Sequence, residues 1–247
     1  MRGFLSFVCL ISVFCVACGS SDKPPGPLDK HFDEMYIAAI PLDHKQNVVQ
    51  TQQNWNVARM ENANADAQVK ESDSQLHQAR NDLSAAKLAV DSANSNKKSA
   101  DTSADMNRIN EATKSLATAK DVQKAAEARV KYLETYRSYL GRYLRYTQEN
   151  MYFREAEFEA AKAQLAKTNN IAPKGVTYEA FPKQQDDRRS RTESAKSKAE
   201  SAKASVSSQR DNWLHVQEQA DKENGHAGVF WDPMAPKVQP TAPSASN

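Results

Sequence analysis

Few side chains in the 247-residue sequence have the types and spacing that catalysis or metal binding requires. No two of the five histidines lie three or four residues apart, so they do not form the pair on one helix face that commonly binds zinc. A run of Glu155, Glu157 and Glu159 stands among Arg and Lys residues, a pattern typical of surface ion pairs rather than acid–base machinery. No nucleophile elbow, phosphate-binding glycine loop or zinc-protease motif is present. We therefore expect a protein that is not an enzyme and that binds no metal or other cofactor.

The cysteines carry information about location rather than catalysis. All three lie in the first 18 residues, so none can cross-link the rest of the chain. An apolar run over residues 4–16 follows Arg2, and it is shorter than the roughly 20 residues that a membrane-spanning helix needs. Residues 1–17 are therefore predicted to be a cleavable secretion signal.

The tetrapeptide Cys15-Val16-Ala17-Cys18 resembles the lipobox of bacterial lipoproteins, with Cys15 at a position that normally holds Leu or a similar residue. In that class the signal peptidase cuts before the cysteine, whose thiol then carries diacylglycerol and whose amine is acylated. The resemblance implies a covalent lipid on Cys18 and, because no Asp stands at the second position, export to the outer membrane with the protein facing the periplasm. The alternative is an ordinary signal peptide that leaves Cys18 as a free thiol.

Residues 18–41 are rich in Ser, Pro and Asp, a composition that favours a flexible, lipid-anchored tether. Its inner part, residues 35–40, is apolar enough to pack on the base of whatever body follows.

The overall composition excludes several classes of protein. Residues 42–172 contain no Pro and one Gly, which rules out an all-β fold. The 33 Lys and Arg residues nearly balance the 31 Asp and Glu residues, so the chain offers no broad basic field for nucleic acid.

Heptad repeats predict an antiparallel coiled-coil hairpin over residues 42–168. Large apolar residues recur every seven positions over 48–90 and again over 109–165, and the companion positions are mostly Ala. The polar stretch 92–105 predicts a turn with its tip near residue 101, and a continuous rod is the alternative shape. Folding the chain there places large residues opposite small ones, as in Val90 with Ala112, Leu83 with Ala119 and Leu76 with Ala126.

A third helix is expected over residues 183–224, after a loop at 169–182. It would return along the second helix and end near the level of residue 127, leaving residues 77–125 as a bare two-helix arm. The predicted fold class is therefore all-α: a long antiparallel coiled-coil hairpin with a third helix packed on its base.

The second helix also carries a row of tyrosines on a face other than its heptad seam. We expect an aromatic layer between the second and third helices, because tyrosine buries its ring well when its hydroxyl stays wet or bonded. The alternative is an exposed row that grips a partner or a glycan. The row comprises Tyr132, Tyr136, Tyr139, Tyr143 and Tyr146.

Two further features could mediate contacts. The Pro- and Ser-rich tail, residues 225–247, contains Phe230 and Trp231 in a compact apolar motif, which either packs on the protein's own helices or is read by another protein as a linear motif. The basic cluster Arg188, Arg189 and Arg191 is either a solvated helix end or a contact for phospholipid head groups.

These features together favour a non-catalytic, lipid-anchored spacer or assembly component of a bacterial envelope complex. Its expected partners are the membrane and an unidentified envelope protein, with no nucleic acid, and self-association is compatible with the sequence. The alternatives are a periplasmic holdase-type chaperone and a regulator of an envelope enzyme.

Overall fold

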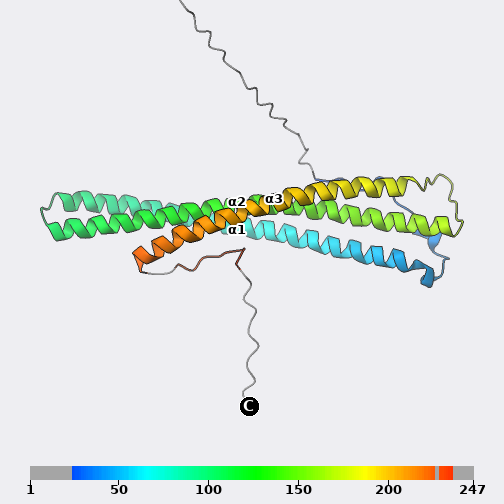
Figure 1. Ribbon diagram of the computed structural model, residues 1–247, viewed down its shortest axis with the longest axis horizontal. Helices are drawn as coiled ribbons and strands as arrows, with labels where there is room; N and C mark the ends of the chain where they lie inside the picture. Colours follow the sequence, from blue (N-terminus) through cyan, green and yellow to red (C-terminus); the bar gives the residue numbers. More distant parts are fainter. Residues whose placement is uncertain (1–23, 226–227, 236–247) are drawn as a thin grey trace, which may run out of the picture.

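The computed structural model describes residues 24–225 and 228–235, and within them the chain is all-α. Three long helices carry the fold, as Figure 1 shows, and two short 3-10 helices precede them. The long helices are α1 (Gln46–Asp101), α2 (Met106–Thr168) and α3 (Ala180–Asn224), and the short ones are η1 (Glu34–Ile37) and η2 (Leu42–Lys45). The predicted fold class is confirmed: α1 and α2 form a long antiparallel hairpin, and α3 packs along α2.

The hairpin turns within four residues. Asp105 caps the start of α2, since its side chain accepts hydrogen bonds from the amides of Asn107 (2.9 Å) and Arg108 (3.3 Å). Ala104 adopts the left-handed conformation, with φ of 57°, which reverses the chain between the two helices. The tip therefore lies at residues 102–105, just beyond the position near 101 predicted from the sequence.

The pairing register of α1 and α2 differs from the expected one by one heptad. Thr147 donates a hydrogen bond to Asn62 across the seam (3.2 Å), and the two residue numbers total 209 instead of the predicted 202. Near the tip, Val90 and Ala93 of α1 pack with Leu116 of α2 in one apolar cluster. Each α1 seam residue faces a partner seven positions further along α2 than predicted. The seam residues themselves are the predicted ones, because a shift of seven keeps the same stripe in contact.

The three long helices form a twisted ribbon with α2 in the middle (Figure 1). α2 packs against both α1 and α3, whereas α1 and α3 barely meet. Trp213 of α3 stacks on Tyr132 of α2, and α3 ends eleven residues after Trp213, which places its end near the level of residue 121. The hairpin extends beyond that end as a two-helix arm of about 22 Å, at 1.5 Å per residue. The arm is shorter than the predicted one.

The segment before α1 is not a flexible tether in its described part, residues 24–41. Leu28, Phe32, Ile37 and Ile40 are all buried. Phe32, Ile37 and Ile40 join a core at the base of the ribbon that also contains Val48 of α1, Phe158 of α2 and Phe181 of α3. The prolines suggested an extended and solvated chain, but the apolar residues between them supply enough surface to dock it.

The third helix begins three residues before the predicted start. Pro182 lies in its first turn, where a missing backbone N–H costs nothing because that group has no partner inside the helix. At the other end, Gly225 has φ of 71° and ends the helix with its amide bonded to the carbonyl of Asp221. Among the described residues, no helix is both long and apolar enough to cross a membrane.

Candidate interaction site

Two faces of α2 are left between α1 and α3, since these two helices lie on opposite sides of it. The tyrosine row follows one face. The acidic run that contains Glu159 follows the other: Tyr143 and Glu159 are sixteen residues apart, or about 160° around the helix at 3.6 residues per turn. Residues 228–235 partly cover the first face, and residues 24–41 partly cover the second. We call these the tyrosine face and the acidic face.

The rings of the tyrosine face form a ladder along α2 from Tyr136 to Tyr146, and Tyr132 before it stacks on α3. Tyr132 is fully buried against Trp213, with ring centroids 5.2 Å apart and planes only 8° apart. From Tyr136 onward each ring centroid lies 6.0 Å from the next, and burial decreases along the row. The expected aromatic layer between α2 and α3 therefore holds for Tyr132. Tyr139, Tyr143 and Tyr146 are half-buried, with no ring from α3 stacked on them.

The described part of the tail, residues 228–235, lies on the tyrosine face. Trp231 meets Tyr136 edge to face, with centroids 6.0 Å apart and planes at 76°. The ring of Phe230 lies 4.6 Å from the guanidinium carbon of Arg129, a cation–π contact. The side chain of Arg129 is itself buried and forms an ion pair with Asp82 of α1 at 2.8 Å. The tail thus packs on the protein's own helices, and its two aromatic residues contact α2.

Asp232 is the polar centre of this contact. Its Oδ2 accepts hydrogen bonds from Nε (2.8 Å) and Nη2 (2.7 Å) of Arg210 on α3, and its Oδ1 accepts one from the Tyr132 hydroxyl (2.7 Å). Oδ1 also accepts the amide of Met234 at 3.1 Å, which closes a turn in the tail. One carboxylate therefore ties the tail to α2 and α3 together, and we call this arrangement the Asp232 clasp.

The clasp shifts the ionisation of its members. Burial would raise the pKa of Asp232, but the hydrogen bonds from Arg210 and Tyr132 outweigh it and hold this pKa below its ordinary value. The same hydrogen bond raises the pKa of Arg210. Burial raises the pKa of Tyr132, and also that of Tyr136, Tyr139 and Tyr143. The tyrosines therefore remain neutral, and the ladder offers rings and hydroxyl groups rather than charge.

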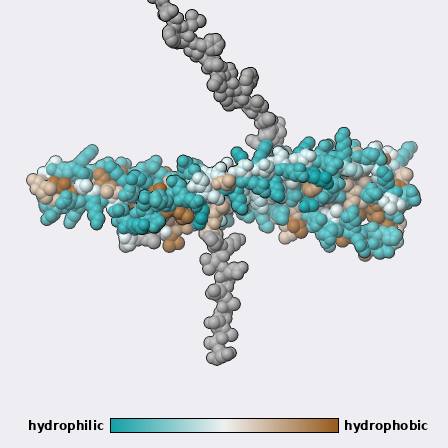
Figure 2. Space-filling model, in the orientation of Figure 1, coloured by the Kyte–Doolittle hydropathy of each residue, from teal (hydrophilic) through white to brown (hydrophobic). Residues whose placement is uncertain are grey.

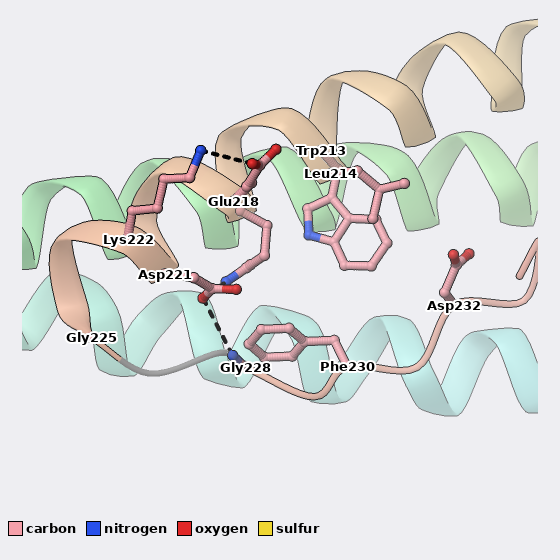
Figure 3. A pocket seen from close by; sticks show the side chains of 10 residues that line it. Trp213, Leu214, Glu218, Asp221, Lys222, Gly225, Gly228, Phe230 and Asp232 are labelled. Carbon is pink, nitrogen blue, oxygen red and sulfur yellow. Dashed lines mark hydrogen bonds and ion pairs between the residues drawn. The ribbon is translucent and has the colours of Figure 1, made fainter.

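A hollow lies between the end of α3 and the returning tail, and Figure 3 shows its lining. Trp213 and Phe230 reach into it from its two sides. Its carboxylates are already engaged: Glu218 pairs with Lys222 at 2.7 Å, and Asp221 accepts the amide of Gly228 at 3.3 Å. The hollow is therefore a support for the tail, and it holds no pair of carboxylates arranged for acid–base work.

The acidic face holds the N-terminal segment through charged side chains. Glu159 accepts the amide of Phe32 and pairs with Lys162 at 2.9 Å, and both charged side chains are buried. Arg188 of α3, also buried, donates to the carbonyls of Gly26 and Pro27 at 3.0 Å each. The sequence suggested that Glu159 and Arg188 are charges at the surface, but both side chains are buried. Both satisfy backbone groups that the docked segment would otherwise leave unbonded.

The remaining members of the two charged clusters are exposed, like Arg189 and Arg191, or half-buried, like Glu155 and Glu157. Arg189 pairs with Asp186, Glu157 pairs with Arg154, and Arg191 is exposed. Burial raises the pKa of Glu155, which lies near His31 and Glu159. In the described part of the chain, no three His, Cys, Asp or Glu side chains are grouped to hold a metal ion.

The structure brings most of the predicted contact residues together in one place. Tyr132, Tyr136, Phe230 and Trp231 form the tail contact, Tyr139 and Tyr143 continue the ladder beside it, and Cys18 lies outside the described residues. Nothing in the sequence indicated that Arg129 and Arg210 hold the tail. It suggested other roles for Glu159 and Arg188, which together with Lys162 hold the N-terminal segment. No motif marks their contacts with the two docked segments, because the residues in contact lie between 22 and 162 positions apart along the chain.

Comparison with known proteins gives no relative from which a function could be carried over: no family model, no curated protein and no solved structure matches this chain.

Proposed function

We propose that this protein is a non-catalytic, lipid-anchored coiled-coil component of a bacterial envelope complex, held at the outer membrane through Cys18 and facing the periplasm. Its task is to space or assemble other envelope proteins. The observation that carries the proposal is the division of the ribbon into a three-helix base, on which the segments 24–41 and 228–235 are packed, and a two-helix arm that projects from it. Such an arm places a contact surface at a fixed distance from the anchored end.

The arm offers surface for a partner rather than a reaction site. Leu88 on α1 and Met106 at the start of α2 are large apolar side chains that are 69% and 67% exposed. The core beneath the arm is thin, with Val90, Ala93 and Leu116 at its centre. These features fit a helical partner that packs along or beyond the tip.

Crosslinking in membranes tests the assembly role. A photoactivatable residue at position 88 or 106 is expected to give one dominant crosslinked protein, whereas the same residue at Leu214, an exposed position on α3, is expected to give less of that product. A broad set of unfolded outer-membrane proteins on the arm would instead establish the chaperone alternative. An envelope enzyme whose activity changes on binding would establish the regulator alternative.

Labelling with a clickable fatty acid tests the anchor. The native protein should incorporate the label and fractionate with the outer membrane, and Cys18→Ala should lose both properties. Equal labelling of the two proteins would remove the anchor from the proposal.

A further inference from the structure

Large apolar side chains are exposed at the base of the ribbon, around the start of α1. They belong to η1, η2 and the first four turns of α1, and Figure 2 shows hydrophobic residues among hydrophilic ones at this end of the molecule. We call this set the base patch. It comprises Met35, Tyr36, Leu42, Val49, Val57 and Met60, which are 72%, 39%, 75%, 38%, 55% and 67% exposed.

The base patch is continuous from the short helices onto α1. Met35 and Val49 line the same shallow hollow, beside Phe158 of α2. Val49 and Met60 are eleven residues apart, which is about three helical turns, so they share one line along the outer side of α1. That side faces away from the seam with α2. The α1 residues in the seam, such as Val48 and Ala58, are buried. The patch is therefore a surface that the described chain leaves uncovered.

We propose that the base patch contacts the lipid bilayer, as a second attachment beside the lipid on Cys18. This inference rests on the proposed anchor, because the short link between Cys18 and the docked segment is what brings the bilayer within reach. One acyl-bearing residue together with an apolar surface forms the kind of two-part attachment that fixes how a peripheral protein lies on a membrane.

The docked N-terminal segment fixes where the anchor leaves the ribbon. The carbonyls of Gly26 and Pro27 bind Arg188, and the guanidinium carbon of Arg188 lies 5.3 Å from the ring centroid of Tyr152. Pro24, the first described residue, is two positions before Gly26. The anchored chain therefore joins the ribbon on its side, near the level of Tyr152, and not at either end.

Distances along α2 then restrict the posture of the ribbon. Tyr152 is 16 residues before Thr168, so the base extends about 24 Å beyond the point of attachment, and the rest of the ribbon extends about 69 Å the other way, from Tyr152 back to Met106. Six residue steps separate Cys18 from Pro24, and they span at most about 22 Å when fully extended. A ribbon standing upright on its base would need this link to be close to its full extension. A ribbon that leans, with the base patch against the bilayer and the arm raised, satisfies the link without stretching it.

The chemistry of the base patch suits a bilayer surface. Tyr36 carries a ring with a polar tip, the kind of side chain enriched at membrane–water interfaces, and Met35 and Leu42 are flexible apolar side chains beside it. Lys45 and His44 at the end of η2 provide basic groups at the same level. The N-terminal segment that carries Met35, Tyr36 and Leu42 is held on the helices by the buried Phe32 and Glu159, so the patch has a fixed place beside the start of the described chain.

An environment-sensitive fluorophore tests the contact in the full-length lipidated protein. In the mature lipidated chain Cys18 is blocked, so a single introduced cysteine is the sole free thiol. Met35→Cys and Leu42→Cys probe the base patch, and Leu88→Cys and Met106→Cys are matched controls because the native side chains are equally exposed on the arm. Each protein is labelled with nitrobenzoxadiazole and placed in phosphatidylethanolamine–phosphatidylglycerol vesicles with and without nitroxide-bearing lipids.

Labels at 35 and 42 should show blue-shifted emission and strong quenching by the nitroxide lipids, and labels at 88 and 106 should show neither. Base labels that remain as water-exposed as the arm labels, on protein that floats with the vesicles, would overturn the base contact and leave the anchor intact. Protein that does not float, and whose Cys18 takes up the fluorophore, would instead overturn the anchor and with it this inference.

Discussion

The Asp232 clasp makes the docking of the tail depend on one carboxylate, and Asp232→Asn tests it. The amide side chain keeps an oxygen for the Tyr132 hydroxyl but removes the negative charge that Arg210 contacts at 2.7 and 2.8 Å. The Asp232 side chain is only 11% exposed, so water compensates little for the lost contact. We expect the tail to detach more often while the three helices remain folded.

The size of the effect follows from the type of bond that is lost. Hydrogen bonds to charged groups contribute about 1.5–3 kcal/mol net, and the two from Arg210 converge on one oxygen, so we count them as one such interaction. A loss of about 1.5–3 kcal/mol raises the detached population about 10- to 100-fold, since 1.4 kcal/mol corresponds to a factor of ten.

Hydrogen exchange of a peptide covering residues 228–235 measures this population. The amides of Gly228 and Met234, which bond to Asp221 and Asp232, should lose protection by the stated factor, and peptides from α2 should not change. Asp211→Asn is the matched control, because it removes one negative charge next to Arg210 from an exposed position outside the clasp. Equal exchange in the two variants would show that the aromatic contacts alone hold the tail.

Three more outcomes follow from the packing. Because the pKa of Asp232 is below its ordinary value, the stability that its charge provides is present above about pH 4 and is lost as pH falls through the lowered pKa, so exchange of residues 228–235 should rise in acid before the helices unfold. Trp213→Ala removes a ring that is 2% exposed and stacked on Tyr132, and it should lower the free energy of unfolding by about 3–5 kcal/mol in urea melts followed by circular dichroism. Replacing the polar seam pair by Asn62→Leu with Thr147→Val should leave the free energy of unfolding equal or higher. The same double variant should broaden the distribution of spin-label distances between α1 and α2, because a polar seam pair favours one register. An unchanged distance distribution would contradict that role.

The helices and their contact stripes could be predicted from the sequence because heptad spacing is a local signal. Val90 and Leu116 lie in the seam in both the predicted and the observed register. The register itself is not local: a slip of seven residues keeps every large residue in its stripe. Two features distinguish one register from the other: the cap that Asp105 forms at the start of α2, and the hydrogen bond between Thr147 and Asn62. Neither is found by matching large residues with small ones.

The docking of residues 24–41 was harder to predict, because their composition favours a solvated chain whereas their contacts bury part of it. The prolines around Gly26 favour an extended chain, and extended is what this segment is, but Leu28 and Phe32 give it a buried side. The charged partners that hold it, such as Arg188, look like ordinary surface residues of a helix. Long-range pairs of this kind leave no spacing signal in a single sequence.

A single layer of three helices explains why both ends of the chain are needed on the body. In a compact bundle each helix buries one stripe, but a central helix with neighbours on opposite sides has two further faces to cover. On α2 these faces carry tyrosines and buried charges rather than Leu or Val, so they require partners that offer rings and hydrogen bonds. The segment around Phe32 supplies them on one face, and the segment around Trp231 supplies them on the other. Where neither segment reaches, at Tyr139, Tyr143 and Tyr146, the ladder remains half-exposed, and a variant that lengthens the aromatic cover of the tail should stabilise the ribbon there.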